Sequence, residues 1–339
     1  MNNKKILIIG GTGSLGKSLI ARLKNTNIVG VFSRDEAKHW TIKNSENHNK
    51  NIQFFVGDIR DFERVEQTIV NFNPDIIIIA AALKQVDTCE LAPEESIKTN
   101  IMGPKNVVKV IEKNINRLNC STVLMVSTDK ACEPINVYGM CKSISERIVT
   151  SQSMNFDKER IRFIGTRYGN VLDSRGSIIP LFKYQSLNND SITITDERMT
   201  RYVMTLDESV DLIIKAVDIA KSGEILIPKL KAMRIKDLAE IYSELSGKPI
   251  SVVGIRPGEK IHEKLVCEAE SLRTQDIGDH YLLESSTSKI SFKDADIFEF
   301  SSENDVVTKQ ELKEYLSDLG HLDLDLQRYV GKSIEDIKT

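Results

Sequence analysis

Short, continuously apolar runs alternate with segments of helical spacing through the first half of the chain. The apolar runs cover residues 6–9, 28–32, 52–56, 76–80, 122–126 and 161–166. Segments between them, such as 15–23 and 65–72, repeat apolar side chains at the period of a helix. Strands that are apolar throughout are typical of a parallel sheet covered on both faces by its crossover helices. The pattern therefore predicts an α/β fold built on a doubly wound parallel sheet.

The second half of the chain has a less regular pattern. It predicts strands at 191–195 and 224–227 and helices at 208–220, 235–245 and 309–319. We interpret these elements as a smaller α+β lobe at the carboxyl ends of the sheet, where substrates of such folds bind. The expected units are residues 1–170, residues 171–280 and a C-terminal extension of residues 281–339.

Composition and charge narrow the class of protein. The 339 residues include 46 Lys and Arg against 49 Asp and Glu, a net charge of -3, which leaves no positive excess for a nucleic-acid backbone or an anionic membrane surface. The longest apolar run, residues 76–83, is too short to span a bilayer. The first residues lead into a strand without the apolar core of an export signal. We expect a soluble, cytoplasmic protein that binds neither nucleic acid nor membranes.

The metal-binding residue types are scattered. The five histidines have no metal-ligand spacing, and no Cys-x-x-Cys pair occurs among the five cysteines, Cys89, Cys120, Cys132, Cys141 and Cys267. This usage is typical of reduced thiols in the cytosol, so the sequence predicts no metal site.

A glycine-rich loop follows the first strand. Gly10, Gly13 and Gly16 are spaced by three, with Thr12, Ser14 and Leu15 among them, and a helix begins within the loop. Glycines allow the backbone to approach a pyrophosphate, and a helix N-terminus offers unpaired N–H groups to it. We therefore predict a dinucleotide at this end of a Rossmann-type sheet, in preference to a plain glycine-rich turn.

The end of the second strand distinguishes the two nicotinamide cofactors. Ser33, Arg34 and Lys38 would neutralise a 2'-phosphate, which favours NADP. Asp35 would serve NAD if the strand ran longer, and Arg34 with Lys38 is also compatible with a solvated surface pair. Asp58 and Ile59, after the third strand, are candidates to hold the adenine edge, with a helix-capping loop as the alternative.

The candidate catalytic residues follow the fifth strand. Residues 127–130 read Ser-Thr-Asp-Lys, and Tyr138 and Lys142 then lie at i and i+4 on one face of a helix. An ammonium near the Tyr138 phenol would lower its pKa toward neutrality, so that it takes a proton from a substrate hydroxyl. A Tyr-x-x-x-Lys pair is commonplace on helices, but its position after this glycine loop favours catalysis.

Taken together, these residues resemble the extended short-chain dehydrogenases/reductases that act on nucleotide sugars. The chain is most similar to the inverting UDP-N-acetylglucosamine 4,6-dehydratases of capsule and O-antigen pathways, which are also 5-epimerases. Within residues 6 to about 265, the segments that carry the resemblance are 33–36, 81–84, 98–103, 127–131, 170–171, 199–201 and 256–260. The Ser-Thr-Asp-Lys element is the most specific, because retaining hexose dehydratases have an Asp-Glu pair there and simple C4 epimerases lack a paired acid and base.

The resemblance implies a redox-neutral reaction on UDP-N-acetylglucosamine with NADP. Tyr138 would remove the C4 hydroxyl proton, with Thr128 as a hydrogen bonder to that hydroxyl and Lys142 beside it. Lys130 would take the C5 proton, its pKa pushed down by Lys142 and the positive nicotinamide, and a protonated Asp129 would donate to the leaving C6 hydroxyl. The product would be a 4-keto-6-deoxy sugar of inverted C5 configuration. A surface ion pair is the alternative interpretation of Asp129 and Lys130.

Further residues acquire roles from the same resemblance. Arg201 and Arg256 are forked donors suited to the two phosphates, Glu259 would accept from the uridine ribose, and Asn170 would donate to a phosphate or sugar. Solvated surface arginines are the alternative. Lys84 is expected to contact both cofactor and substrate, and Ala80 and Ala81 to lie against the cofactor.

Two other functions remain open at this point. A nucleotide-sugar C4 epimerase or reductase would use the same scaffold, although neither reaction needs Asp129 and Lys130 to eliminate water. A catalytically inactive NADP-binding regulator is the second alternative, disfavoured by the intact Tyr138 and Lys142. The resemblance further implies a homo-oligomer, either a dimer or a hexamer.

Overall fold

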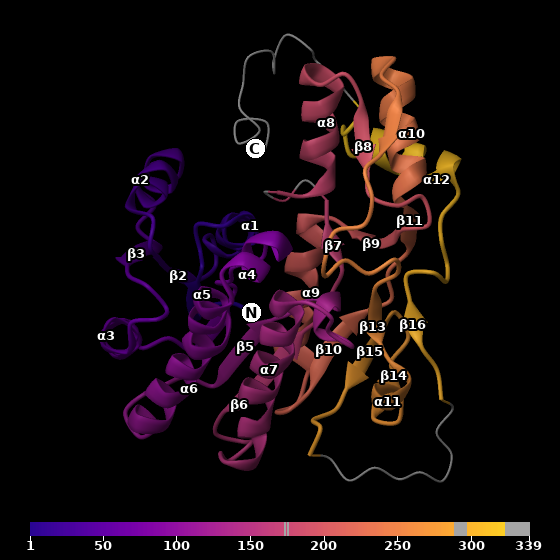
Figure 1. The fold of residues 1–339 in the computed structure, drawn as a ribbon. Coiled ribbons are helices and arrows are strands. Elements are labelled where there is room, and N and C mark those ends of the chain that lie inside the picture. Colours follow the sequence, from indigo (N-terminus) through magenta and orange to yellow (C-terminus); the bar gives the residue numbers. More distant parts are fainter. Residues whose placement is uncertain (173, 175, 288–296, 323–339) are drawn as a thin grey trace.

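A nine-stranded, mostly parallel sheet forms the centre of the molecule (Figure 1). The computed structural model describes residues 1–172, 174, 176–287 and 297–322. Only β15 runs against its neighbours. In order across the sheet, the strands are β14 (Thr274–Asp276), β15 (His280–Leu283), β10 (Ile225–Pro228), β6 (Arg162–Thr166), β5 (Thr122–Val126), β4 (Ile76–Ile79), β1 (Lys5–Ile9), β2 (Ile28–Ser33) and β3 (Ile52–Val56).

Each face of this sheet has its own helical layer. Even-numbered residues of β1 and β4 pack with α1 (Ser14–Leu23) and α9 (Leu206–Ile219). Odd-numbered residues of the same strands pack with α3 (Phe62–Phe72), α6 (Gly103–Asn114) and α7 (Val137–Thr150). Alternation along a strand explains the division, and burial on both faces explains the continuous apolar runs. The predicted doubly wound α/β fold is confirmed.

Further helical segments connect these elements. The helix α2 (Glu36–Ser45) follows β2. The segments that precede α6 are α4 (Val86–Leu91), α5 (Pro93–Ile97) and a π-helical turn, Lys98–Met102. Two single turns flank α7, namely the 3₁₀ turns Asp129–Ala131 and Ser151–Met154.

A smaller lobe lies beside the carboxyl ends of the sheet, at the upper right of Figure 1. Its apolar core joins α8, α10 and α12 to the small strands. The strands of this lobe are β7 (Asn170–Val171), β8 (Ile192–Ile194), β9 (Thr200–Met204), β11 (Ala232–Arg234) and β12 (Ile250–Val252). Two further short strands, β13 (Lys264–Val266) and β16 (Phe300–Ser301), pair with each other and pack with β10 and β15. The helices of the second half, besides α9, are α8 (Ile178–Asn188), α10 (Ile235–Ser246), α11 (Glu268–Ser271) and α12 (Lys309–Asp318).

The main sheet extends beyond residue 170, unlike the division expected from sequence. The strand predicted at 224–227 for the smaller lobe is β10, which pairs in parallel with β6. The helix α9 acts as a further crossover that returns the chain to the sheet edge, where β15 and β14 then add. The late helix α12 packs on α10 through Leu312 and Leu316. Residues 288–296 and 323–339 of the predicted C-terminal extension lie outside the described residues.

None of the helices in the described part of the chain combines the length and apolar character needed to cross a membrane.

Candidate active site

A cleft of about 850 Å³ opens where the main sheet meets the smaller lobe. Its walls come from the loops that follow β1, β2, β4 and β5 and from the lobe segments around β7, β9 and residues 253–263. All the candidate site residues except Asp129 line this cleft, namely Gly10, Thr12, Gly13, Ser14, Leu15, Gly16, Ser33, Arg34, Lys38, Asp58, Ile59, Ala80, Ala81, Lys84, Thr128, Lys130, Tyr138, Lys142, Asn170, Arg201, Arg256 and Glu259. The fold thus brings together residues that the sequence scatters over 250 positions.

The glycine loop lies tightly between β1, β4 and α1. Gly10 has φ +90°, and a Cβ there would lie 2.6 Å from the backbone N of Ala81. A Cβ on Gly16 would collide with the backbone O of Gly11, within the loop itself. The N-cap of α1, Gly13, makes no side-chain cap hydrogen bond, and a Cβ on it meets nothing closer than 3.4 Å. This open, glycine-lined helix start fits a pyrophosphate.

The end of β2 is organised by hydrogen bonds. Thr12 Oγ1 donates to Ser33 Oγ at 2.9 Å, and Ser33 Oγ also bonds His39 Nε2 at 2.8 Å. Asp35 accepts from the backbone N of Lys38 as the N-cap of α2 and pairs with the Lys38 ammonium. These hydrogen bonds lower the pKa of Asp35. Because β2 ends at Ser33, Asp35 lies beyond the strand and caps α2. The Asp35 carboxylate, which would serve NAD, is therefore already engaged by the helix cap.

The cationic side chains at this end have acidic partners. Arg34 is half exposed, and its Nη1 lies 3.7 Å from Asp58 Oδ2. Asp58 Oδ2 also accepts from Arg60 Nη2 at 2.7 Å. Ile59 is buried beneath them. Among the residues that the structure describes, Arg34 has one long ion pair, that with Asp58, so its guanidinium can take a second anionic partner at the cleft.

Tyr138 and Lys142 project from α7 at the bottom of the cleft and are both buried. Burial raises the pKa of Tyr138 to about 12, against the lowering effects of Lys130 and of a hydrogen bond with Thr128. Lys142 Nζ donates to the backbone O of Val126, and burial lowers its pKa to about 8. Lys130 thus lowers the pKa of the phenol, an effect that the sequence led us to expect from Lys142.

Lys130 lies between two carboxylates. Its Nζ is 3.1 Å from Asp129 Oδ1 and 3.2 Å from Glu263 Oε1. Burial opposes the charge on Lys130, but the two carboxylates outweigh burial and raise its pKa above the usual value. The expectation that Lys142 would depress this pKa was wrong, because the acidic neighbours are closer and carry the opposite charge.

Asp129 is fully buried and reaches the cleft only through its neighbours. Its Oδ1 accepts from Thr128 Oγ1 at 2.9 Å and from Lys130 Nζ. Its Oδ2 has no hydrogen-bond partner within the described residues. An unpaired buried carboxylate oxygen is costly, so Asp129 Oδ2 is an acceptor that a ligand could engage.

Glu263 is the site residue that sequence reasoning missed. It lines the cleft, is 2% exposed, and has an Oε2 without a hydrogen bond among the described residues. No spacing rule links it to Lys130, because β13 and the preceding loop bring it in from the second half of the chain. Its position just after the segment 256–260, which carried part of the family resemblance, was the one available signal.

On the lobe side, the arginines differ in their surroundings. Arg201 donates to the backbone oxygens of Thr200, Lys260 and Ile261 at 2.7 to 2.9 Å, which fixes its guanidinium at the cleft wall. Arg256 and Glu259, expected to bind different parts of a nucleotide, form an ion pair with each other. Asn170 places a buried Oδ1 at the cleft without a hydrogen bond among the described residues.

Comparison with known proteins identifies the family. Residues 6–285 match the family described as polysaccharide biosynthesis protein. The chain belongs to this family. Its relatives include a UDP-glucose 4-epimerase of Rickettsia bellii, 39% identical over 82% of each chain. A protein of Methanocaldococcus jannaschii, named as an uncharacterized membrane protein, is 37% identical over 83% of this chain and 86% of the other.

Solved structures agree with the family assignment. Pen from Bacillus thuringiensis is 34% identical, with a TM-score of 0.86 over 94% of this chain and 99% of that one. DesIV of Streptomyces venezuelae, a dTDP-glucose 4,6-dehydratase solved with NAD and TYD, has a TM-score of 0.66 at 19% identity over 76% of this chain and 86% of that one. The second likeness shows the fold alone. Members and structural neighbours of this family thus include nucleotide-sugar epimerases and dehydratases on a Rossmann scaffold.

Proposed function

We propose that this family member is an NADP-dependent UDP-N-acetylglucosamine 4,6-dehydratase that inverts C5. The observation that carries the proposal is the contact of Lys130 with Asp129 and Glu263, beside Tyr138 in one cleft. Oxidation at C4 needs a group such as Tyr138, whereas elimination of water needs an additional acid and base. The product is UDP-2-acetamido-2,6-dideoxy-L-arabino-hexos-4-ulose.

NADP fits the residues of the nucleotide end. The open helix start at Gly13 suits the pyrophosphate, and Ser33, Arg34 and Lys38 suit the 2'-phosphate, since Asp35 is occupied by its helix cap. Asp58 and Ile59 bound the space for the adenine. NADP held by these residues would supply a hydride acceptor for C4 and, once reduced, a hydride donor for C6.

Tyr138 starts the reaction by taking the proton of the C4 hydroxyl. Thr128, next to the phenol, orients that hydroxyl. Because burial holds the pKa of Tyr138 at about 12, the phenol depends on nearby positive charge to act as a base near neutral pH. Lys130 is one source of that charge.

The two carboxylates hold a proton on Lys130, so Lys130 acts as a base only after it has given up that proton. Transfer of one proton from the Lys130 ammonium to Asp129, 3.1 Å away, produces a neutral amine and a carboxylic acid together. The amine takes the C5 proton that the C4 ketone has acidified, and the acid protonates the leaving C6 hydroxyl. Glu263, which lines the cleft itself, is the alternative carboxyl for the same transfer. A proton derived from solvent then adds to C5 on the opposite face.

The lobe side of the cleft holds the nucleotide sugar. Arg201, fixed by backbone oxygens, faces the two phosphates, and Arg256 joins it by exchanging its Glu259 partner for a phosphate. Glu259 is then released to accept from the ribose hydroxyls. Asn170 and Lys84 contact the sugar or its phosphates.

A C4 epimerase of nucleotide sugars is the second candidate. It is favoured by the name of the Rickettsia bellii relative, a UDP-glucose 4-epimerase at 39% identity. An epimerase needs Tyr138 and the dinucleotide but has no use for the proton transfer between Lys130 and Asp129.

Incubation of the protein with UDP-N-acetylglucosamine in deuterated water, without added reductant, tests both candidates. The dehydratase yields a product that has lost one water, gained deuterium at C5 and has L-arabino couplings in early NMR spectra. UDP-N-acetylgalactosamine at unchanged mass would instead identify an epimerase. A D-xylo product would contradict inversion, and an unreacted sugar would support a non-catalytic NADP-binding protein.

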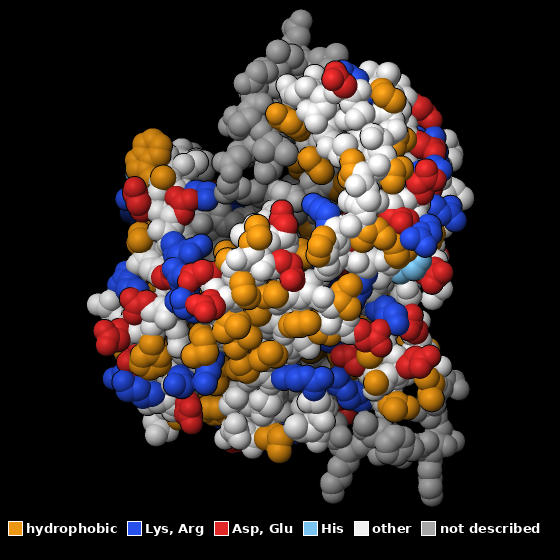
Figure 2. All heavy atoms as spheres, viewed as in Figure 1, with side chains coloured by type: hydrophobic (Ala, Val, Ile, Leu, Met, Phe, Trp, Pro, Cys, Tyr) orange, Lys and Arg blue, Asp and Glu red, His pale blue; other side chains and the backbone are white. Residues whose placement is uncertain are grey.

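The chain is also proposed to self-associate. Exposed apolar side chains occur on neighbouring helices α4 to α7, and Figure 2 shows apolar side chains gathered over these helices. We call this surface the apolar face, formed by Leu91, Ile97, Met102, Met140 and Ile144. A large exposed apolar patch is typical of a protein interface, and a second copy of the chain is its proposed partner.

A further inference from the structure

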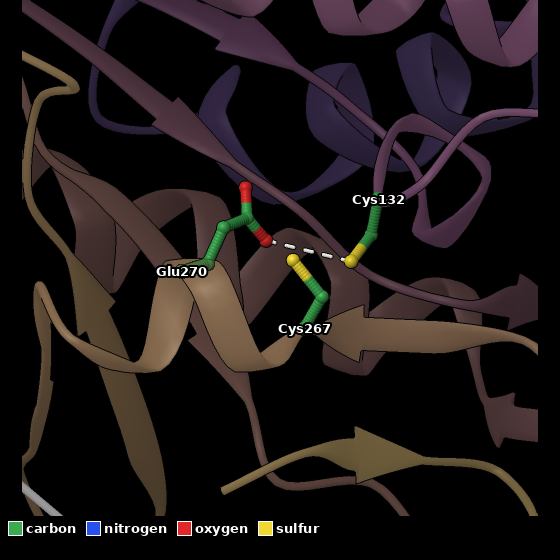
Figure 3. Close-up of side chains that lie close together, drawn as sticks. All are labelled: Cys132, Cys267 and Glu270. Carbon is green, nitrogen blue, oxygen red and sulfur yellow. Dashed lines mark hydrogen bonds between the residues drawn. The ribbon is translucent and has the colours of Figure 1, made fainter. Parts of the chain in front are cut away.

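Two buried thiols face each other next to the catalytic turn. Cys132 directly follows the 3₁₀ turn Asp129–Ala131, and Cys267 directly precedes α11. Figure 3 shows their sulfurs directed at one another from these two segments. The two Sγ atoms and a carboxylate oxygen of Glu270 all lie within 4.8 Å of one another. The fold therefore creates a cysteine pair that sequence spacing does not reveal.

The same three side chains are a possible ligand set for a metal such as Zn²⁺. However, Glu270 already accepts from Arg167 through both oxygens, at 2.6 and 2.9 Å, and Arg273 approaches the same carboxylate at 3.4 Å. Cys132 Sγ donates to it as well, at 3.4 Å. Two guanidinium groups thus supply the positive charge that a divalent cation would otherwise bring. These surroundings favour a pair of thiols over a metal site.

The two thiols differ in character. The neighbouring thiol of Cys132 lowers the pKa of Cys267 to about 7, against burial and the charges of Glu270 and Glu133. The proximity of Cys267, together with burial, raises the pKa of Cys132, with Arg167 opposing. A thiolate next to a protonated thiol is the arrangement from which disulfides form, because the thiolate is the nucleophile. Cys267 is also the more accessible of the two cysteines, 7% exposed against 1% for Cys132.

We propose that Cys132 and Cys267 form a dithiol that hydroperoxides oxidise to a disulfide. The Cys267 thiolate attacks one peroxide oxygen and breaks the O–O bond, which gives a sulfenic acid and releases hydroxide, or an alkoxide from an organic peroxide. The sulfur of Cys132 then attacks the sulfenic sulfur, losing its proton. The S–S bond replaces the S–O bond and water leaves. Two thiols are oxidised by two electrons, and the peroxide is reduced.

The disulfide would act on the active site through a short path. Lys130 lies two residues before Cys132, and the backbone O of Cys132 accepts from Lys260 Nζ at 2.7 Å, beside the cleft-lining Glu259. A disulfide needs its sulfurs at about 2.05 Å, so closure draws the catalytic turn toward α11. Oxidation therefore lowers the rate of sugar turnover, a consequence that rests on the proposed function.

Peptide mapping tests the disulfide without reference to activity. Reduced full-length protein is treated with hydrogen peroxide, alkylated under denaturing conditions and digested. The number of free thiols falls by two from the five cysteines of the chain, a peptide linking Cys132 to Cys267 appears, and dithiothreitol removes it. The variant Cys120→Ala, which removes a buried cysteine two residues before β5, retains this behaviour, and Cys267→Ser abolishes it.

Other outcomes overturn the proposal. A different link, such as Cys89 to Cys141, or sulfonic acid without a cross-link would contradict it. Stoichiometric zinc in the reduced protein that is lost in Cys267→Ser would replace the dithiol with a metal site. If the link forms but turnover of UDP-N-acetylglucosamine by oxidised wild type stays equal to that of reduced wild type, the coupling to the catalytic turn is wrong. Absence of turnover in the reduced protein concerns the proposed function and leaves the cross-link result standing.

Discussion

At the scale of single residues, the most informative group is Lys130 with its two carboxylates. Glu263→Gln removes one charge that raises the pKa of Lys130, so the limb of the kcat/KM profile that reports this amine should move to lower pH. Loss of a proton acceptor should also lower kcat. The matched control is Glu299→Gln, whose carboxylate pairs with Lys264 at the surface and whose loss should leave the profile in place. An unshifted pH profile in Glu263→Gln would show that Glu263 does not raise the pKa of Lys130.

The base itself is tested by Lys130→Ala. Tyr138 and Lys142 remain, so oxidation at C4 should still occur, although more slowly because the positive charge of Lys130 near the phenol is lost, and NADPH absorbance should appear in a single turnover without loss of water. The expected decrease in the dehydration rate is about a hundredfold to ten-thousandfold, the usual effect of a positioned base. Tyr138→Phe is the companion variant, in which neither NADPH nor dehydrated sugar should form. Dehydration by Lys130→Ala at the wild-type rate would assign the base to another group, with Lys84 the first to examine.

Arg34 is the residue on which the choice of cofactor depends. Arg34→Asp removes a charged donor to the 2'-phosphate and adds a like charge, so NADP should bind about tenfold to a hundredfold more weakly, with a much smaller change for NAD. Fluorescence titration with the two reduced cofactors measures the ratio. Lys43→Asp, an exposed position on α2 outside the cleft, makes the same reversal of charge as a control. Equal NADP affinity in Arg34→Asp and wild type would contradict the assignment of Arg34.

At the scale of elements, substitutions of two glycines in the loop before α1 distinguish effects on folding from effects on dinucleotide binding. A Cβ on Gly13 meets no atom closer than 3.4 Å, whereas one on Gly16 collides with the loop backbone. Gly13→Ala should therefore leave the free energy of unfolding within about 1 kcal/mol of wild type and still weaken dinucleotide binding, because its methyl occupies the space of the pyrophosphate. Gly16→Ala should lower both stability and binding. Thermal unfolding and cofactor titration on the two variants give the comparison, and full cofactor affinity in Gly13→Ala would place the pyrophosphate elsewhere.

Elements were predictable from sequence where one local signal determined them. The run Ile76–Ile79 is buried on both faces as β4, and the loop from Gly10 to Gly16 has the conformation its spacing implies. The strand β10 was assigned to the wrong layer, because its apolar pattern records burial and not which sheet it joins. Glu263 and the Cys132–Cys267 pair were missed for a related reason. Their partners are brought by tertiary contacts between distant segments, and no spacing in a single sequence encodes such contacts.

At the scale of the whole molecule, the prediction concerns assembly through the apolar face. Leu91 and Ile144 are exposed on neighbouring helices α4 and α7, and neither side chain lines the cleft. The double variant Leu91→Glu and Ile144→Glu places two charges of equal sign where a second copy would pack. Sedimentation at micromolar concentration should therefore change from an oligomer in wild type to a monomer in this variant, because buried unpaired charges are costly. Trp40→Glu, an exposed apolar residue on α2, serves as the control and should leave the oligomer intact. If wild type sediments as a monomer, or if the double variant stays oligomeric, the apolar face is not the contact between copies.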